Sequence, residues 1–139
     1  MDKFTGYLSF HPLQSGSADD VASALQSHFL VFGPPRRVET DAGTNLKSSK
    51  ISDLCRYFGV EHISGVGYHH EAIGKVERKH LDIKRRLRAL SDGHGIDWEV
   101  HLPGIVFSLN NEVSRSTGYS PYFLYFFASP KCSAGTTAG

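Results

Sequence analysis

The feature that most constrains the fold of this chain is an alternation of short strand-like segments with longer helical ones. Three short segments have the composition of strands: Tyr7–Pro12, Arg36–Thr40 and Val60–Ile63. Between and after them, apolar residues recur at helical spacing over residues 18–32, 49–58, 75–90, 98–110 and 122–126. This alternation favours an α/β domain built in layers, in which the later strands pair in parallel. We expect the first strand of such a sheet to be missing.

Residues that start and stop helices mark the limits of these segments. Ser17 is predicted to be a helix N-cap, because acidic residues follow it in the first turn, where the helix dipole favours negative charge. Gly33, followed by two prolines, is predicted to end that helix. Ser48 or Ser49 is predicted to cap the second helix, which Gly59 closes.

The longest helix is predicted to begin after Gly74. Its apolar residues recur about every 3.5 residues, which is typical of a helix with one buried face. They are Val76, Ile83, Leu87 and Leu90, with His80 filling the one gap. The preceding segment, residues 64–74, holds three glycines and is predicted to be a mobile loop.

Composition limits the class of protein. The 139 residues suit one domain, with residues 1–130 folded and residues 131–139 forming a disordered tail. No apolar run reaches the length of a membrane span, so we expect no membrane partner. Cys55 and Cys132 lie far apart, which argues against a disulfide scaffold. The net charge is only +1, but basic residues outnumber acidic ones from Lys75 to Arg88, as in a local nucleic-acid contact surface.

Two carboxylates lie at positions that predict a binding site for a divalent cation. Asp41 follows a predicted strand, and ligands of open α/β sheets bind at the carboxyl ends of strands. Glu77 is predicted to lie in the first turn of the long helix, flanked by Lys75, Arg78 and Lys79. Mg²⁺ prefers hard oxygen ligands and usually takes one or two carboxylates, with water and phosphate completing its shell. The basic flank would then contact DNA phosphates.

A structural interpretation of the same residues is also open. A strand-end Asp often caps a turn, and a helical Glu often forms an i,i+4 charge pair on a solvated face. His69 and His70 suit a loop better than a metal site, because no cysteine or third histidine is spaced as a zinc ligand. Core or dimer packing explains the C-terminal aromatic residues better than base stacking does. These residues are Tyr119, Tyr122, Phe123, Tyr125, Phe126 and Phe127.

Four ordered segments of the chain match one known protein family. They read "DKFTGYLSFHPL", "FGPPRRVETDAGTN", "YHHEAIGKVERKH" and "DWEVHLPGIVFSLNNEVSRSTGYSPYFLYF". The first segment resembles a hairpin, and the second resembles the strand and turn around the second catalytic Asp. The third resembles a mobile loop and the helix that carries the catalytic Glu, and the fourth resembles the closing helices of the same domain. That domain is the catalytic core of retroviral and gypsy-type retrotransposon integrases. The similarity covers about residues 2–130, and 35 residues separate Asp41 from Glu77 (77 − 41 − 1).

The resemblance implies an RNase H-like mixed sheet flanked by helices, and a D,D,E polynucleotidyl transferase that joins element DNA to target DNA. In such an enzyme Asp41 and Glu77 are catalytic ligands of Mg²⁺ or Mn²⁺. Lys75, Arg78 and Lys79 contact DNA, and the loop over residues 68–74 closes on the substrate. The resemblance further implies a homo-oligomer and, for a functional protein, a nuclear location.

The chain departs from the family in one respect that bears on activity. The family's first catalytic Asp lies on a strand before the hairpin, and we expect this chain to be truncated after it. Asp2 matches the hairpin instead, so we interpret it as structural. We therefore expect the isolated polypeptide to be inactive or impaired in DNA integration. The alternatives are a non-catalytic nucleic-acid-binding or interaction protein derived from a retroelement, and a decayed gene fragment without function.

Overall fold

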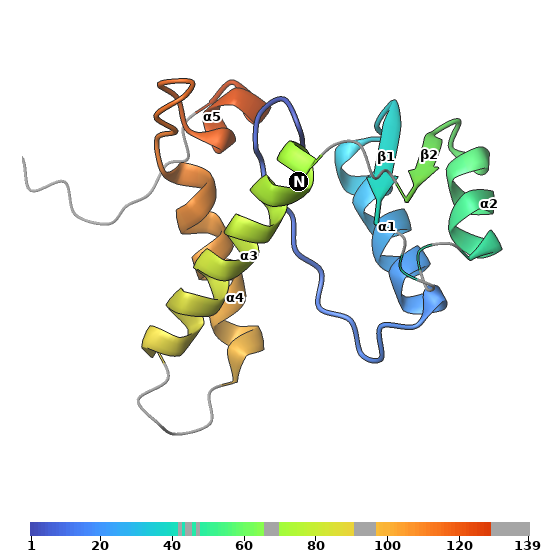
Figure 1. The fold of residues 1–139 in the computed structure, drawn as a ribbon, viewed down its shortest axis with the longest axis horizontal. Coiled ribbons are helices and arrows are strands. Elements are labelled where there is room, and N and C mark those ends of the chain that lie inside the picture. Colours follow the sequence, from blue (N-terminus) through green and yellow to red (C-terminus); the bar gives the residue numbers. More distant parts are fainter. Residues whose placement is uncertain (42, 44–45, 47, 66–69, 91–96, 129–139) are drawn as a thin grey trace, which may run out of the picture. The chain divides into compact units, whose positions relative to one another are not determined.

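The computed structural model describes residues 1–41, 43, 46, 48–65, 70–90 and 97–128 (Figure 1). The chain forms two compact units, which we describe separately. The sheet unit comprises His11–Glu71, and the helical unit comprises Met1–Phe10 together with Ala72–Gly139. In the part of the chain that the structure describes, no helix is long and apolar enough to cross a membrane.

The sheet unit alternates helices and strands as the sequence predicts. Its elements are α1 (Ala18–Phe32), β1 (Arg37–Thr40), α2 (Ser49–Tyr57) and β2 (Glu61–Ser64). The two strands pair in parallel, with Val38 opposite His62 and Thr40 opposite Ser64. The predicted parallel pairing of the later strands is therefore confirmed.

The predicted cap of α1 is also confirmed. Ser17 precedes the helix in an extended conformation, and its hydroxyl oxygen accepts a hydrogen bond of 3.2 Å from the backbone N–H of Asp20. Gly33 ends the helix with a φ of +84°, a backbone conformation that residues other than glycine rarely adopt. Ser48 precedes α2, but its side chain makes no capping hydrogen bond.

A small apolar core holds the sheet unit together. Phe29 from α1 meets Ile51 and Cys55 from α2, and Val60 closes the cluster before β2. The rings of Phe29 and Phe58 meet edge to face, with their centroids 5.4 Å apart. Through these contacts α1 packs against α2, and Val38 of β1 packs on the same core.

The helical unit contains α3 (His70–Leu90), α4 (Trp98–Asn111) and α5 (Pro121–Phe126). Its core is formed by Ile83 from α3, by Leu102, Ile105 and Leu109 from α4, and by Leu8 from the N-terminal segment. In Figure 1, α3 and α4 run alongside each other. Their shared core explains this arrangement, because each helix presents one apolar face.

The prediction of a strand at Tyr7–Pro12 is wrong, because this segment forms no strand. Leu8 is held instead by the buried side chain of Asn110. The Asn110 amide oxygen accepts from the Leu8 N–H at 2.8 Å, and the amide nitrogen donates to the Leu8 carbonyl at 2.9 Å. One side chain thus satisfies the backbone groups that a neighbouring strand would otherwise satisfy.

The predicted start of the long helix is wrong as well. α3 begins at His70, so Gly74 lies inside the helix and Glu77 is its eighth residue (77 − 70 + 1), beyond the first turn. A glycine costs a helix only about 1 kcal/mol relative to alanine, and the apolar face that follows is long enough to offset this cost. Residues 66–69 of the predicted mobile loop, and the predicted tail 131–139, lie outside the described residues.

Candidate metal and nucleic-acid site

Asp41 lies at the carboxyl end of β1, as predicted. Its side chain is exposed, and its Oδ1 accepts a hydrogen bond of 3.1 Å from the backbone N–H of Gly43. Its backbone carbonyl accepts a hydrogen bond of 3.5 Å from the hydroxyl of Ser64, at the end of β2. The turn therefore orients the Asp41 carboxylate, and the neighbouring strand holds the Asp41 backbone.

Gly43 lies in close contact with Asp41 in this turn. A Cβ at position 43 would lie only 3.1 Å from Asp41 Oδ1 and 3.7 Å from Leu46 Cδ1. A side chain here would therefore crowd Asp41 Oδ1 and require a small shift of the carboxylate. The turn uses Oδ1 of Asp41 as the acceptor for the Gly43 amide.

Glu77 lies on the exposed surface of α3, among the basic residues of the predicted flank. Lys75 and Arg78 are exposed and Lys79 is half-buried. Arg78 folds back along the helix, where its Nε donates to the Gly74 carbonyl at 3.1 Å. The segment therefore presents one carboxylate and several cations on a solvated helix.

The alternative of an i,i+4 charge pair does not account for Glu77. The residues four positions before and after it are Ile73 and Leu81, which carry no charge. Among the residues that the structure describes, no ion pair involves Glu77. The carboxylate is thus available to a partner from outside the helix.

Asp41 and Glu77 belong to different units, the first to the sheet unit and the second to the helical unit. Their convergence on one cation stays a prediction. Within the described residues, no three His, Cys, Asp or Glu side chains are grouped as a self-contained metal site. His69 lies outside the described residues, and so does Cys132.

The donor chemistry of the two carboxylates fits a hard divalent cation. Both carboxylates are exposed oxygen donors, and Asp41 is already oriented by the Gly43 amide. Mg²⁺ and Mn²⁺ take such oxygen ligands and commonly complete their shells with water and phosphate. Asp41 and Glu77 therefore remain the predicted ligands of the cation.

Asp2 has a structural role in the helical unit. Its Oδ1 accepts from the Thr5 backbone N–H at 2.7 Å and from the Thr5 hydroxyl at 2.6 Å. Its backbone also bonds to Gly6 and Tyr7, which closes a tight turn. These bonds account for the carboxylate at position 2 without a metal.

The C-terminal aromatic residues pack mainly against the N-terminal segment. Tyr7 stacks on Tyr125 with ring centroids 4.6 Å apart, and meets Phe126 edge to face at 5.4 Å. Burial is the largest cause that raises the pKa of Tyr7 above its ordinary value. Packing, as predicted, explains Tyr122, Tyr125 and Phe126, whereas Tyr119 and Phe127 are 54% and 81% exposed. Trp98, the first residue of α4, is 44% exposed.

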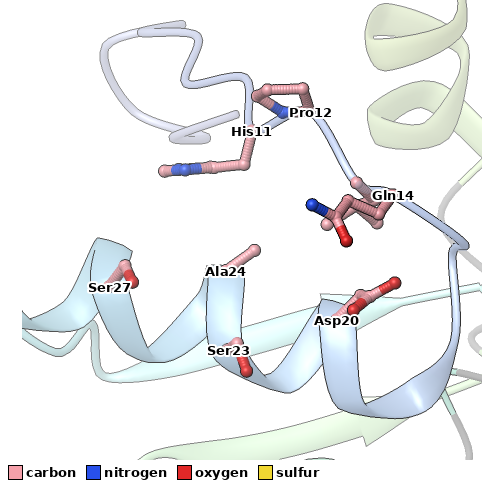
Figure 2. A pocket seen from close by; sticks show the side chains of 8 residues that line it. His11, Pro12, Gln14, Asp20, Ser23, Ala24 and Ser27 are labelled. Atoms are coloured by element: carbon pink, nitrogen blue, oxygen red, sulfur yellow. The ribbon is translucent and has the colours of Figure 1, made fainter.

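A shallow hollow of about 320 Å³ lies in the sheet unit between α1 and the segment before it. Figure 2 shows His11, Pro12 and Gln14 on that segment facing Asp20, Ser23 and Ser27 on the helix. Asp20 is already engaged, because its Oδ2 accepts hydrogen bonds from the backbone and hydroxyl of Ser15. The hollow therefore has no free charged group that points to a ligand.

One feature near Asp41 was missed in the sequence analysis. The side chains of Thr40 and His62 share a hydrogen bond across the two strands, 3.1 Å from Oγ1 to Nε2. A threonine and a histidine 22 residues apart give no local sequence signal, because only the register of the parallel strands brings them together.

Comparison with known proteins relates the chain to retroelement polyproteins. No family model matches it. It is 37% identical over 123 residues to the retrovirus-related Pol polyprotein from transposon 412 of Drosophila melanogaster, covering 88% of this chain and 10% of that polyprotein. It is 32% identical over 126 residues to the Pro-Pol polyprotein of simian foamy virus type 3, covering 91% and 11%. The chain thus spans about a tenth of the length of these relatives.

Solved structures give the same relationship at the level of the fold. The catalytic core domain of BIV integrase matches with a TM-score of 0.73 and 27% identity, covering 88% of this chain and 79% of that one. The HTLV-2 integrase catalytic core domain in complex with magnesium matches with a TM-score of 0.73 and 20% identity, covering 89% and 80%.

The fold is thereby defined as the RNase H-like α/β fold of integrase catalytic cores. Within that class, the chain belongs to the integrases of retroviruses and gypsy-type retrotransposons, as its motifs predict. The small parallel sheet and the helices of the two units are the parts of that fold that carry Asp41 and Glu77.

Proposed function

We propose that this chain carries the catalytic core of a retroelement integrase, which integrates DNA by metal-dependent strand transfer. The observation that supports the proposal best is the pair of available carboxylates. Asp41 is oriented at the carboxyl end of β1, and Glu77 lies on α3 with no charge partner among the described residues. The chain positions of both residues match the second Asp and the Glu of the family's D,D,E motif.

In this proposal each side chain has a separate task. Asp41 and Glu77 bind Mg²⁺ or Mn²⁺, which when bound stabilises the charge that develops on the oxygens of the reacting phosphate. Lys75, Arg78 and Lys79 bind the DNA backbone, because ammonium and guanidinium groups neutralise phosphates without reading the base sequence. For a functional protein we propose a nuclear location, where the target DNA lies.

Only two carboxylates of this polypeptide match the three of the D,D,E motif. Two ligands bind paired cations more weakly than three, so we propose that the isolated 139-residue chain has little strand-transfer activity. A second candidate function is nucleic-acid binding without cleavage, which the exposed cations Lys75 and Arg78 on α3 favour. The two candidates differ in whether Asp41 and Glu77 still bind a metal.

Calorimetric titration with Mn²⁺ tests the proposal. We expect saturable binding to the unmodified chain and its loss in the variant with both Asp41→Asn and Glu77→Gln. Each single variant should bind clearly more weakly than the unmodified chain, because each removes one ligand of a shared ion. Equal heats from the unmodified chain and the double variant would rule out the metal site and leave the non-catalytic candidate.

A further inference from the structure

The hydrogen bond between Thr40 and His62 lies immediately before the candidate metal ligand. Thr40 is the last residue of β1, and its Oγ1 is 3.1 Å from Nε2 of His62 in β2. Thr40 is paired with Ser64 in the register and His62 with Val38, so the bond runs diagonally across the ladder. Both side chains are half-buried, which limits competition from water for this bond.

The face of the sheet on which this bond lies is anchored. Side chains alternate along a strand, so Thr40 points to the same face as Val38, which packs on the core of the sheet unit. Because His62 bonds to Thr40, it lies on that face as well. The bond therefore connects the end of β1 to a packed part of the unit rather than to a solvated surface.

Three further hydrogen bonds converge on the same strand end. The Gly65 N–H donates to the Thr40 carbonyl at 3.2 Å, and the Ser64 hydroxyl donates to the Asp41 carbonyl at 3.5 Å. The Gly43 N–H donates to Asp41 Oδ1 at 3.1 Å. Each of these three bonds uses a backbone group, whereas the Thr40–His62 bond joins two side chains. Substitution of Thr40 or His62 therefore removes that bond without altering the backbone groups.

We propose that Thr40 and His62 are positioning residues for Asp41, a proposal that rests on the proposed metal-dependent function. Their hydrogen bond fixes the last residue of β1 and thereby the direction in which the Asp41 carboxylate leaves the sheet. Neither residue touches the cation. Partners of this kind, one step behind a ligand, commonly set the affinity of a metal site by holding the ligand in its binding geometry.

The opposite end of the same strand pair supplies a matched control. Arg37 Nε and Glu61 Oε2 form an ion pair of 2.8 Å between the first residues of β1 and β2, and both side chains are about half exposed. Glu61→Gln removes the charge of this cross-strand ion pair at the end of the strand pair opposite Asp41. A general weakening of the sheet would affect both ends, whereas a positioning role belongs only to the end that carries Asp41.

The first test needs no metal. NMR spectra of the metal-free protein report the Asp41 carboxyl carbon and the Gly43 amide in each variant. We expect Thr40→Val and His62→Phe to shift both signals, because they keep the bulk but remove the bond. Thr40→Ser and His62→Gln, which retain a hydroxyl and a side-chain nitrogen, should restore the signals of the unmodified protein. Unchanged signals in Thr40→Val and His62→Phe would overturn the proposal.

The second test measures Mn²⁺ affinity in the same variants. We expect Thr40→Val and His62→Phe to bind about tenfold more weakly, and Thr40→Ser, His62→Gln and Glu61→Gln to bind as the unmodified protein does. Equal affinity in all five variants, or an equal loss in Glu61→Gln, would contradict a positioning role. If the unmodified protein bound no Mn²⁺, the proposed function would fail, while the metal-free spectra would still decide whether the bond orients Asp41.

Discussion

His28 shows how a single side chain makes the sheet unit sensitive to pH. Its ring meets those of His11 and Phe32, with centroids 5.6 Å and 4.7 Å away. Its Nδ1 is buried and has no hydrogen-bond partner in the described part of the chain. Burial, followed by repulsion from His11, lowers the pKa of His28 below the ordinary value of histidine. The folded unit therefore favours the neutral ring.

This lowered pKa predicts that stability decreases in mild acid. The unfolded chain takes up the proton near pH 6.5, while folded His28 resists it, so the free energy of unfolding should fall as the pH drops below about 6.5. Below the folded pKa the decrease should level off. His28→Leu should flatten this dependence, because it removes both the titrating group and the unpaired nitrogen. Urea unfolding between pH 5 and 8 measures the effect, and identical slopes in the two proteins would contradict it.

At the scale of elements, side chains join α3 to α4 beyond their shared core. Arg86 on α3 donates from Nη1 to the Ser108 hydroxyl at 3.1 Å, and its Nη2 forms an ion pair with Glu112. Arg85, one residue earlier, reaches only Asp82 on its own helix, at 3.9 Å. Arg86 thus makes an interhelical contact, whereas the contact of Arg85 lies within its own helix.

We expect Arg86→Met to lower the free energy of unfolding by about 0.5–1 kcal/mol, since the pair is partly exposed and such pairs are worth little more. Methionine keeps the apolar stem, so the loss reports the hydrogen bond and ion pair. Arg85→Met serves as the control and should be nearly neutral. Denaturant unfolding at low and high salt distinguishes the two variants, because salt screening should reduce the loss of unfolding free energy caused by Arg86→Met. Equal effects of both substitutions would refute the interhelical role.

The elements also show which parts of the fold are readable from sequence. The limits of α1 could be predicted because Ser17 and Gly33 act on the backbone next to them. The segment at Tyr7–Pro12 could not, because its composition suits a strand but its partner, Asn110, lies 102 residues from Leu8. The start of α3 was misplaced because Gly74 weakens a helix without stopping it.

The candidate site, like the fold, could be predicted from sequence only in part. Asp41 could be placed at a strand end, and Glu77 on a basic helix, from local pattern and spacing. The Gly43 contact and the Thr40–His62 bond could not, because they depend on a turn conformation and on strand register. Sequence therefore indicated the candidate ligands, whereas the groups that orient Asp41 required coordinates.

At the scale of the whole molecule, α4 carries apolar side chains that remain partly exposed. Val100 is 69% exposed and Phe107 is 41% exposed. They lie seven residues apart, so they share one face of the helix, opposite the buried Leu102, Ile105 and Leu109. Burying such a surface favours association, so we expect this face to promote self-association of the chain.

Sedimentation velocity tests this expectation. Val100→Lys should shift the protein toward the monomer, because it places a charge in the middle of an apolar contact. Val113→Lys is the matched control, since Val113 is equally exposed, at 68%, but lies beyond the end of α4. A monomeric unmodified protein, or equal dissociation of both variants, would contradict an interface on α4.

The central claim is that Asp41 of the sheet unit and Glu77 of the helical unit bind one cation. The most direct measurement is paramagnetic broadening of backbone amide signals during titration with Mn²⁺. We predict that the Gly43 and Arg78 signals broaden together at the same metal concentration, and that Asp41→Asn abolishes both effects. Broadening at only one of the two positions, or persistence at Arg78 in Asp41→Asn, would mean that the two carboxylates do not share a metal.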